Sequence, residues 1–323
     1  MSALTVTVII PTYNRPDCVR RCLACLMAQE PRPDQIIVVD ASPDTRTRDV
    51  VAEFEGVEYI ANPDGRGNTP NSRNKALARS RGDIIAFLDD DAFVHPGWSA
   101  ALLETYEDET VAGVAGRALN HQPGEESRGV NEIGLLKPNG VLTGYFAADP
   151  GRIVEVDHGI GCNMSLRRSV IAELGGFRDD FRAGPFGICE ETELCIRARK
   201  AGYQMVFNPA VCCDHIGAAQ PGGRRFSVKY DYYVARNTLV MLLRIYGPLA
   251  PIVWRYLGRS LLVHGALEFL RRIAAAFARL GILLAGTATG LAAGLWLALT
   301  QGTGPIRHGR EAEELREQMG RRG

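Results

Sequence analysis

The chain has 323 residues, of which 46% are hydrophobic and 23% are charged, and its formal net charge is zero. These values place it among ordinary α/β proteins with a large core, built as one large domain or two smaller ones. The charge is uneven: residues from 237 onward carry 11 Arg, 5 Glu and no Lys or Asp, a net charge of +6, whereas residues 1–236 carry −6. The acidic body argues against nucleic acid as a ligand, and the Arg-rich apolar tail suits an anionic membrane surface.

The eight cysteines do not show the spacing of a disulfide framework or a zinc site. Cys18, Cys22 and Cys25 fall at helical intervals, and the remaining five form no paired C-x-x-C knuckles. We therefore expect reduced core thiols. The first five residues lead straight into an apolar strand and lack the features of an export signal, which predicts a cytoplasmic body.

The first part of the chain predicts strands that alternate with helices. The expected strands are 6–10, 35–39, 57–60 and 83–88. The expected helices are 16–29, 45–55 and 73–81, with a Gly/Asn/Pro-rich loop at 62–72. This order is typical of a doubly wound α/β domain, in which ligands bind beyond the carboxyl ends of the strands. We expect residues 11–14, Asp40 and the acids after residue 88 to share that edge.

Three consecutive carboxylates, Asp89, Asp90 and Asp91, follow the apolar strand 83–88 directly. Adjacent like charges repel at low effective dielectric. A strand end that keeps them together is therefore expected to hold a hard divalent cation, for which carboxylate oxygens are the natural ligands. That cation would in turn hold phosphates. The alternative is a solvated acidic turn, since Asp is common in turns.

Six motifs in order resemble the family 2 glycosyltransferases of the GT-A fold, over roughly residues 5–215. They are the opening strand and loop Val8–Arg15, the nucleoside loop Val38–Asp44, the R-N helix start Ser72–Leu77, the acidic triplet, the acceptor-side strand His158–Arg168 with Gly175–Phe177, and the helix Cys189–Leu194 with Arg197 and Ala201–Tyr203. The resemblance implies an α/β fold of GT-A type, a doubly wound mixed sheet with helices on both faces. It also implies sugar transfer from a nucleotide-sugar donor.

The resemblance assigns roles to residues at this edge. Asp91 is expected to be the main ligand of Mn or Mg, with Asp89 and His215 as further ligands. His95 and His158 are alternatives to His215 as groups near the metal. The residues expected to bind the nucleotide sugar are Pro11, Thr12, Tyr13, Asp40, Arg73, Asp89 and Asp90. Arg73 is a candidate for the diphosphate, and the alternative is an exposed first-turn arginine.

Direct displacement from a sugar diphosphate needs a base opposite the leaving group to take the acceptor's proton. Glu191 is the candidate, although the family usually carries Asp there, and its extra methylene moves the carboxylate by more than about 1 Å. Either the acceptor lies further away, or Glu190 or Glu193 shares the role. Asn163 is expected on the acceptor side or in support. The alternative for the three glutamates is a solvated helix face, with Arg197 four residues after Glu193.

From about residue 237 the sequence predicts long apolar helices, so we divide the chain into a domain at 1–236 and a helical, membrane-associating region at 237–323. The stretch 280–300 is uncharged over 21 residues, long enough to span a bilayer. Arg271, Arg272 and Arg279 precede it and Arg307 and Arg310 follow it, so the positive-inside rule selects no orientation. We favour monotopic attachment to the cytoplasmic leaflet over a single span. A soluble helical appendage that covers its apolar face with a partner chain is the third option.

These observations predict an inverting, metal-dependent glycosyltransferase acting on a saccharide or lipid-linked acceptor at the membrane surface, in cell-surface polysaccharide or glycolipid synthesis. A homo-oligomer is compatible with this reading, and no nucleic-acid partner is expected. One alternative is a nucleotidyltransferase, but residues 11–14 do not form the Gly/Lys/Arg-rich phosphate loop expected after its first strand. The other is a non-catalytic sugar-nucleotide or partner-binding module, which would have lost acids that this chain retains.

Overall fold

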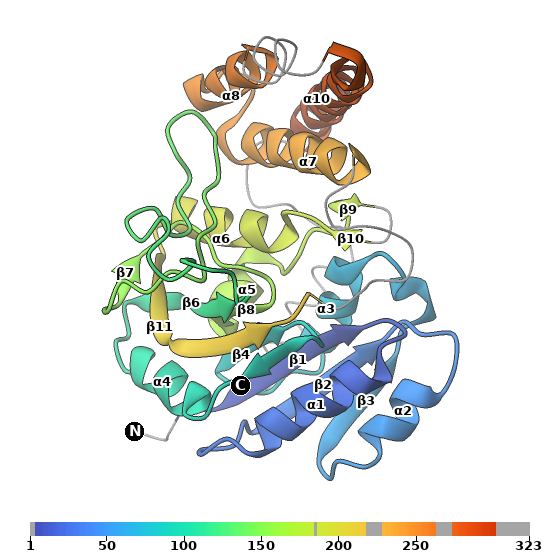
Figure 1. Cartoon of the computed structure of the whole chain (residues 1–323), viewed down its shortest axis with the longest axis vertical. Coiled ribbons are helices and arrows are strands. Elements are labelled where there is room, and N and C mark those ends of the chain that lie inside the picture. The colour runs from blue at the N-terminus through green and yellow to red at the C-terminus, as the bar shows by residue number, and fades with distance from the viewer. Residues whose placement is uncertain (1–3, 184–185, 218–227, 263–272, 302–323) are drawn as a thin grey trace. The chain divides into compact units, whose positions relative to one another are not determined.

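The structure is a computed structural model of the chain, and it describes residues 4–183, 186–217, 228–262 and 273–301 (Figure 1). The chain divides into two compact units. The sheet unit is built mainly from Met1–Leu135 and Thr143–Ala219, and the helical unit from Leu136–Leu142 and Gln220–Arg307. The expected boundary at 236/237 lies within the helix Val228–Tyr246.

Nine strands of the described sheet unit form one mixed sheet in the order β3-β2-β1-β4-β8-β6-β11-β5, with β7 paired to β11 (Figure 1). Their bounds are β1 Val6–Thr12, β2 Gln35–Asp40, β3 Val57–Ala61, β4 Ile84–Leu88, β5 Ala92–Val94, β6 Val111–Leu119, β7 Val154–Glu155, β8 Asn163–Arg167 and β11 Gln204–His215. Strands β1 to β4 run parallel, whereas β8 is antiparallel to both β4 and β6. A separate antiparallel pair consists of β9 Arg182–Ala183 and β10 Phe186–Gly187.

Helices cover both faces of this sheet, because the buried strands present apolar side chains alternately to each face. In β1, Val8 and Ile10 belong to one core cluster and Ile9 to the other. The first cluster includes residues of helices α1 Pro16–Met27, α2 Arg46–Val51 and α4 Trp98–Thr105. The second includes residues of α3 Thr69–Leu77, α5 Arg168–Leu174 and α6 Glu190–Lys200. The predicted mixed α/β sheet with helices on both faces is therefore confirmed.

Helix α3 shows where the sequence prediction failed. It begins at Thr69 rather than 73 and ends at Leu77 rather than 81. The Asn68 side chain caps it by accepting a hydrogen bond from the Asn71 N–H at 3.3 Å, and Pro70 occupies its first turn. The sequence pattern places Asn68 and Pro70 in the preceding loop, whereas in the structure they form the start of the helix. A short 3-10 turn, η1 Pro63–Gly65, occupies part of that loop.

The helical unit contains α7 Val228–Tyr246, α8 Pro251–Leu262 and α10 Ile273–Gln301, and α7 packs against the other two (Figure 1). The segment Gly281–Thr300 of α10 is long and apolar enough to cross a bilayer by length and composition, with a mean hydropathy of 1.8. The flanking arginines at 271, 272, 307 and 310 lie outside the described residues. All eight cysteines lie in the sheet unit and are free thiols, as predicted.

Candidate active site

The loops after β1 and β2 meet at one edge of the sheet, as the strand order predicts. Since β1, β2 and β4 are parallel, their carboxyl ends lie together. The Ala41 N–H donates to the Thr12 carbonyl at 3.0 Å, and the Asn14 N–H donates to the Ser42 hydroxyl at 2.8 Å. Asn14 has a φ of 54°, a left-handed conformation that Asn tolerates better than most residues. The loop after β4, which carries the acidic triplet, opens at the same edge.

The three acids are not equivalent. Asp90 is fully buried, and its Oδ2 accepts hydrogen bonds from the Thr12 hydroxyl at 2.5 Å and the Arg15 Nε at 3.0 Å. The same guanidinium reaches Asp91 at 3.1 Å. Burial raises the pKa of Asp90 to about 7, against the opposing effect of Arg15. Arg15, for which the sequence suggested no role, thus supplies part of the positive charge that three adjacent carboxylates require.

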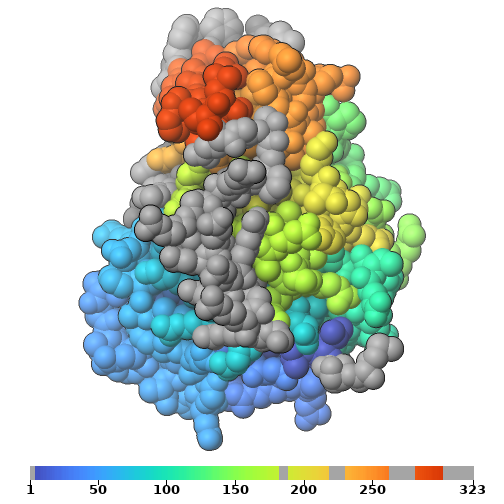
Figure 2. All heavy atoms as spheres, turned by 180° about the vertical axis from the view of Figure 1, so that it is seen from behind, coloured from blue at the N-terminus to red at the C-terminus, as the bar shows by residue number. Residues whose placement is uncertain are grey.

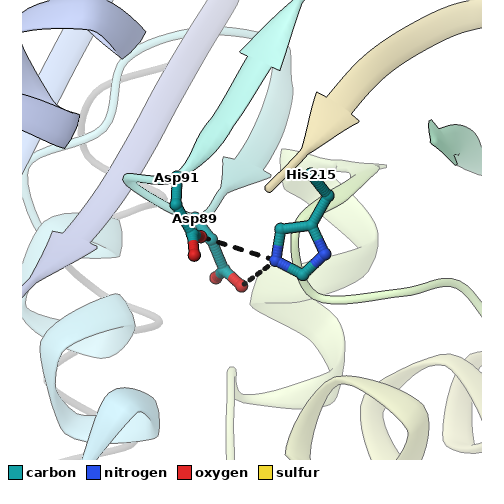
Figure 3. A group of neighbouring side chains, drawn as sticks. All are labelled: Asp89, Asp91 and His215. Atoms are coloured by element: carbon teal, nitrogen blue, oxygen red, sulfur yellow. Dashed lines mark ion pairs between the residues drawn. The ribbon is translucent and has the colours of Figure 1, made fainter. Parts of the chain in front are cut away.

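Asp89, Asp91 and His215 converge on one point (Figure 3). The His215 Nε2 lies 3.4 Å from an Asp91 oxygen and 3.9 Å from an Asp89 oxygen. The ligand atoms all lie within 4.8 Å of one another, on side chains that come from the end of β4 and the end of β11. Two carboxylates and an imidazole suit a divalent cation such as Mn²⁺. The residues at this point therefore fit the expected metal.

The protonation of His215 shows how negative this point is. Burial by itself lowers the pKa of His215, but Cys162, Asp91 and Asp89 together outweigh burial and raise the pKa to about 11. The two carboxylates thus favour a proton on the imidazole. Because a metal-bound imidazole must be neutral, a cation would replace that proton.

Arg73 is buried, which excludes the alternative of an exposed first-turn arginine. Its guanidinium lies 3.6 Å from Asp89, 3.3 Å from Glu190 and donates to the Gly161 carbonyl at 3.0 Å. The rings of Phe87 and Phe177 lie 5.7 and 5.3 Å from the guanidinium carbon. Arg73 thus joins the acidic triplet to the start of α6, two segments far apart in sequence.

The three glutamates at the start of α6 have different surroundings. Glu193 is fully buried between Arg178 and Arg197, each 2.9 Å from one of its oxygens. Glu190 is also buried, and burial, together with the neighbouring Glu191, raises its pKa well above the usual range. Only Glu191 of the three is partly exposed. The alternative of a solvated helix face is therefore excluded for Glu190 and Glu193.

Gly161 allows the Glu191 carboxyl to approach the Arg73 group. A Cβ atom at residue 161 would lie 2.9 Å from the Arg73 Nη2 and 3.3 Å from the Glu191 Oε1. No side chain larger than hydrogen fits there without a shift of these two groups. The partly exposed Glu191 carboxylate and the Arg73 guanidinium therefore both border Gly161, and the same guanidinium lies 3.6 Å from Asp89.

One set of the other predicted site residues lies around the loops after β1 and β2. Asp40 is buried and accepts hydrogen bonds from the Ser42 N–H at 2.8 Å and from the Tyr59 hydroxyl at 3.0 Å. Tyr59 had no assigned role; burial and this hydrogen bond raise its pKa to about 12. Tyr13, in the loop after β1, lies with its ring 5.3 Å from the Arg66 guanidinium carbon. These residues lie at the same sheet edge as the half-buried Pro11.

Asn163 and two histidines serve packing or hydrogen-bond networks. Asn163 is buried, accepts from the Trp98 Nε1 at 3.0 Å and donates to two backbone carbonyls at 2.9 Å. His95 pairs with Asp214 at 2.8 Å. The ring nitrogens of His158 face backbone carbonyls at 2.9 and 3.0 Å. Of the three histidines considered, only His215 joins the Asp89 and Asp91 group.

Comparison with known proteins agrees with this arrangement. The family described as Glycosyl transferase family 2 matches residues 7–175. The pre-mycofactocin glycosyltransferase of Mycobacterium tuberculosis is 29% identical over 215 residues, which cover 65% of this chain and 42% of that protein. The glucosyl-dolichyl phosphate glucuronosyltransferase of Haloferax volcanii is 27% identical over 229 residues, covering 66% of this chain and 69% of that protein.

Among solved structures, the mannosyltransferase PcManGT of Pyrobaculum calidifontis, in complex with GDP-Man and Mn²⁺, superposes with a TM-score of 0.56 at 20% identity. The match covers all of this chain and 86% of that one. It confirms the GT-A type fold of the sheet. With the family match over more than half of the chain, the motifs and the sheet edge that they build lead to one assignment: this protein belongs to glycosyl transferase family 2.

Proposed function

We propose that the protein is an inverting, metal-dependent glycosyltransferase that moves a sugar from a nucleotide-diphosphate sugar to an acceptor hydroxyl. The observation that carries the proposal is the pairing of two chemically different groups around Arg73. Asp89, which converges with Asp91 and His215, lies 3.6 Å from the Arg73 guanidinium, and that guanidinium and the Glu191 carboxylate both border Gly161. Sugar transfer by direct displacement needs both, one for the leaving diphosphate and one for the acceptor proton.

The residues divide the reaction between them. Asp89, Asp91 and His215 would hold the divalent cation. A bound cation would neutralise the negative charge that develops on the leaving diphosphate. Asp90 fixes Arg15 and Thr12 from within the fold, so its role is to position the loop rather than to reach the donor. Asp40 and Tyr13 would hold the nucleoside.

Glu191 would accept the proton of the attacking hydroxyl. Glu193 cannot share that role because two arginines hold its carboxylate inside the fold. Glu190 is buried, with its carboxyl 3.3 Å from the Arg73 guanidinium, so the partly exposed Glu191 is the glutamate that an acceptor hydroxyl can reach. A single base opposite the leaving group gives one displacement, and hence a product of inverted configuration.

Relatives of the chain suggest the acceptor class. They include an O-antigen chain rhamnosyltransferase of Salmonella anatum and a succinoglycan biosynthesis protein of Rhizobium meliloti. The Campylobacter jejuni relative is a glucosyltransferase whose name includes undecaprenol as the lipid part of its acceptor. We infer a saccharide or lipid-linked acceptor in cell-surface polysaccharide or glycolipid synthesis, used at the cytoplasmic face of the membrane.

The test is a donor screen with the full-length protein and a panel of UDP-, dTDP- and GDP-sugars, with manganese, magnesium or a chelator. At least one donor should be hydrolysed or transferred only when a divalent cation is present, with inversion at the anomeric carbon. Release of pyrophosphate from a nucleoside triphosphate and a sugar phosphate would instead show a nucleotidyltransferase. Nucleotide-sugar binding without turnover for any donor, in the presence of acceptor lipids, would favour a non-catalytic module.

A further inference from the structure

Helices α7 and α10 pack with their backbones in close contact along a stripe of glycines. Gly286, Gly290 and Gly294 are spaced four residues apart and lie on the buried side of α10. A Cβ atom at these positions would lie 2.8 Å from the Tyr232 ring, 2.9 Å from the Arg236 carbonyl oxygen and 2.3 Å from a Leu243 methyl, respectively. Small residues at this spacing allow two helices to approach closely. The Tyr232 hydroxyl also lies 2.7 Å from the Thr289 hydroxyl.

The contact fixes which part of α7 would accompany α10 into a bilayer. Gly290 lies at the middle of the apolar segment Gly281–Thr300, and it abuts the backbone of Arg236. If α10 spanned the membrane in this packing, Arg236 would lie near the bilayer midplane, beside the buried Asn237. An arginine at that depth carries a roughly hundredfold penalty on the insertion equilibrium even on the mildest scale. The α7–α10 pair is therefore unsuited to spanning.

The side of α10 opposite its glycines is apolar and exposed, and α8 also exposes large apolar side chains. Only 22% of the apolar segment of α10 is buried, and its atoms, red in Figure 2, form part of the surface of the helical unit. Among its described residues, the helical unit exposes the large apolar side chains of Leu249, Trp254, Leu261, Leu284, Trp296 and Leu299. Leu299 is 82% exposed and Trp296 is 63% exposed. Exposing such large apolar side chains to water is unfavourable, which indicates that another surface covers them.

Charge identifies what covers this surface. The exposed residues Arg255 and Arg259 lie on α8 near Trp254 and Leu261, and neither α8 nor α10 contains an acidic residue. Trp beside Arg, next to leucines, is the composition of a helix face at the boundary between headgroups and acyl chains. An anionic lipid surface matches both the apolar and the cationic part of the face.

We propose that α10 lies in the plane of the membrane, with its glycine stripe on α7 and its opposite side in the lipid interface, together with the Trp254 side of α8. The helical unit is then a monotopic membrane anchor, and α7 stays on the aqueous side of the lipid. This proposal deepens the proposed function, because it specifies how the enzyme reaches a lipid-linked acceptor without crossing the bilayer.

The test measures the depth of single tryptophans along α10. The chain has three tryptophans, and Trp98 is buried in the sheet unit. The background variant carries Trp254→Phe and Trp296→Phe, so that it has no tryptophan in the helical unit. Four variants then each place one tryptophan on α10: three add Leu284→Trp, Ala288→Trp or Ala292→Trp to the background, and the fourth keeps the natural Trp296. All four positions are exposed. The full-length variants are bound to phosphatidylcholine vesicles containing phosphatidylglycerol, with bromine placed either near the headgroups or near the chain ends.

In the proposed orientation all four tryptophans are quenched more by shallow than by deep bromine, with similar depths. In a spanning helix, residues 284 and 296 would be separated by about 18 Å along the bilayer normal, because a helix rises about 1.5 Å per residue. Positions 288 and 292 would then be quenched mainly by the deep bromine, and that result would overturn the proposal.

Vesicle partitioning of the full-length protein supplies the second measurement. Replacing Trp296 and Leu299 together with Ser should lower the partition coefficient at least tenfold, while Ile153→Ser, an exposed change in the sheet unit, should leave it unchanged. Replacing Arg255 and Arg259 with Gln should weaken binding to anionic vesicles but not to neutral ones. Absence of vesicle binding, with a dimer that the Trp296 and Leu299 changes dissociate, would assign the face to a second copy and refute the proposal.

Neither measurement requires donor or acceptor. Failure of the depth profile with metal-dependent donor turnover intact would refute the membrane orientation alone. Absence of turnover with the expected depth profile would refute the proposed function alone.

Discussion

Replacing Glu191 with Gln tests the proposed base. The amide keeps the size of the side chain and its place beside Gly161 but cannot accept a proton. Loss of a general base lowers turnover by about 100-fold or more, which corresponds to about 2.7 kcal/mol of lost transition-state stabilisation. The neighbouring glutamates are poor substitutes, because Glu193 is held between Arg178 and Arg197 and Glu190 is buried beside Arg73. We therefore expect the full loss, with donor affinity nearly unchanged.

Glu190→Gln is the matched control, one residue away and with the same chemical change. It replaces a buried carboxyl beside Arg73 with an amide of the same size, so turnover should fall by much less than in Glu191→Gln. The assay is steady-state turnover with the active donor from the panel, with donor affinity measured separately by calorimetry. Unchanged turnover in Glu191→Gln, a larger loss in Glu190→Gln, or a product of retained configuration would refute the assignment of the base.

Three further outcomes follow from the buried charges. Asp91→Ala removes a carboxylate from the group with Asp89 and His215, so it should abolish metal-dependent turnover. Calorimetry should also show weaker manganese-dependent binding of nucleoside diphosphates. Full activity of this variant would show that the acids form an ordinary turn. Glu193→Gln leaves two buried arginines without their carboxylate and should lower the free energy of unfolding by about 3 kcal/mol, measured by denaturant titration, whereas Asp17→Asn at an exposed position should change little. Because the folded pKa of Glu190 is raised, the native state keeps a proton that the unfolded chain releases above about pH 4.3, and stability falls as pH rises from there toward the folded pKa. Glu190→Gln should therefore lose less thermal stability than the wild type between pH 5 and 8, and parallel curves would contradict this account.

The order of the strands and the residues at their carboxyl ends could be predicted from the sequence. Apolar runs ending in Asp40 and in the acidic triplet are local signals, and the parallel arrangement of such strands brings their ends together. Both inferences need only neighbouring residues and the topology of the sheet. The prediction that His215 is a metal ligand rests instead on the family resemblance, and the structure places its Nε2 3.4 Å from an Asp91 oxygen.

The partners of the buried charges could not be predicted in this way. Arg15 pairs with Asp90 across 75 residues of sequence, and Arg73 approaches Glu190 across 117. Both pairings depend on how loops from different strands pack, which no local pattern encodes. The position of Arg15 in the opening loop, close after β1, was the available clue: a cation at the same sheet edge as three acids has an electrostatic reason to pair with them.

The glycines of α10 were a missed signal of a different kind. In the sequence they only lowered the hydrophobicity of the stretch 280–300. Their four-residue spacing, at 286, 290 and 294, predicts a helix that packs tightly against another helix, and in the structure that neighbour is α7.

The turn at Leu136–Leu142 determines how the chain can be truncated to the sheet unit alone. The chain leaves the sheet unit after Leu135, packs Gly140 against Leu242 of α7 and Tyr256 of α8, and re-enters the sheet unit at Thr143. A chain truncated before α7 therefore keeps this turn but lacks the two helices against which the turn packs. A soluble form of the enzyme for crystallisation or inhibitor screening calls for two edits, a stop at the C-terminal boundary and a short polar linker in place of residues 136–142.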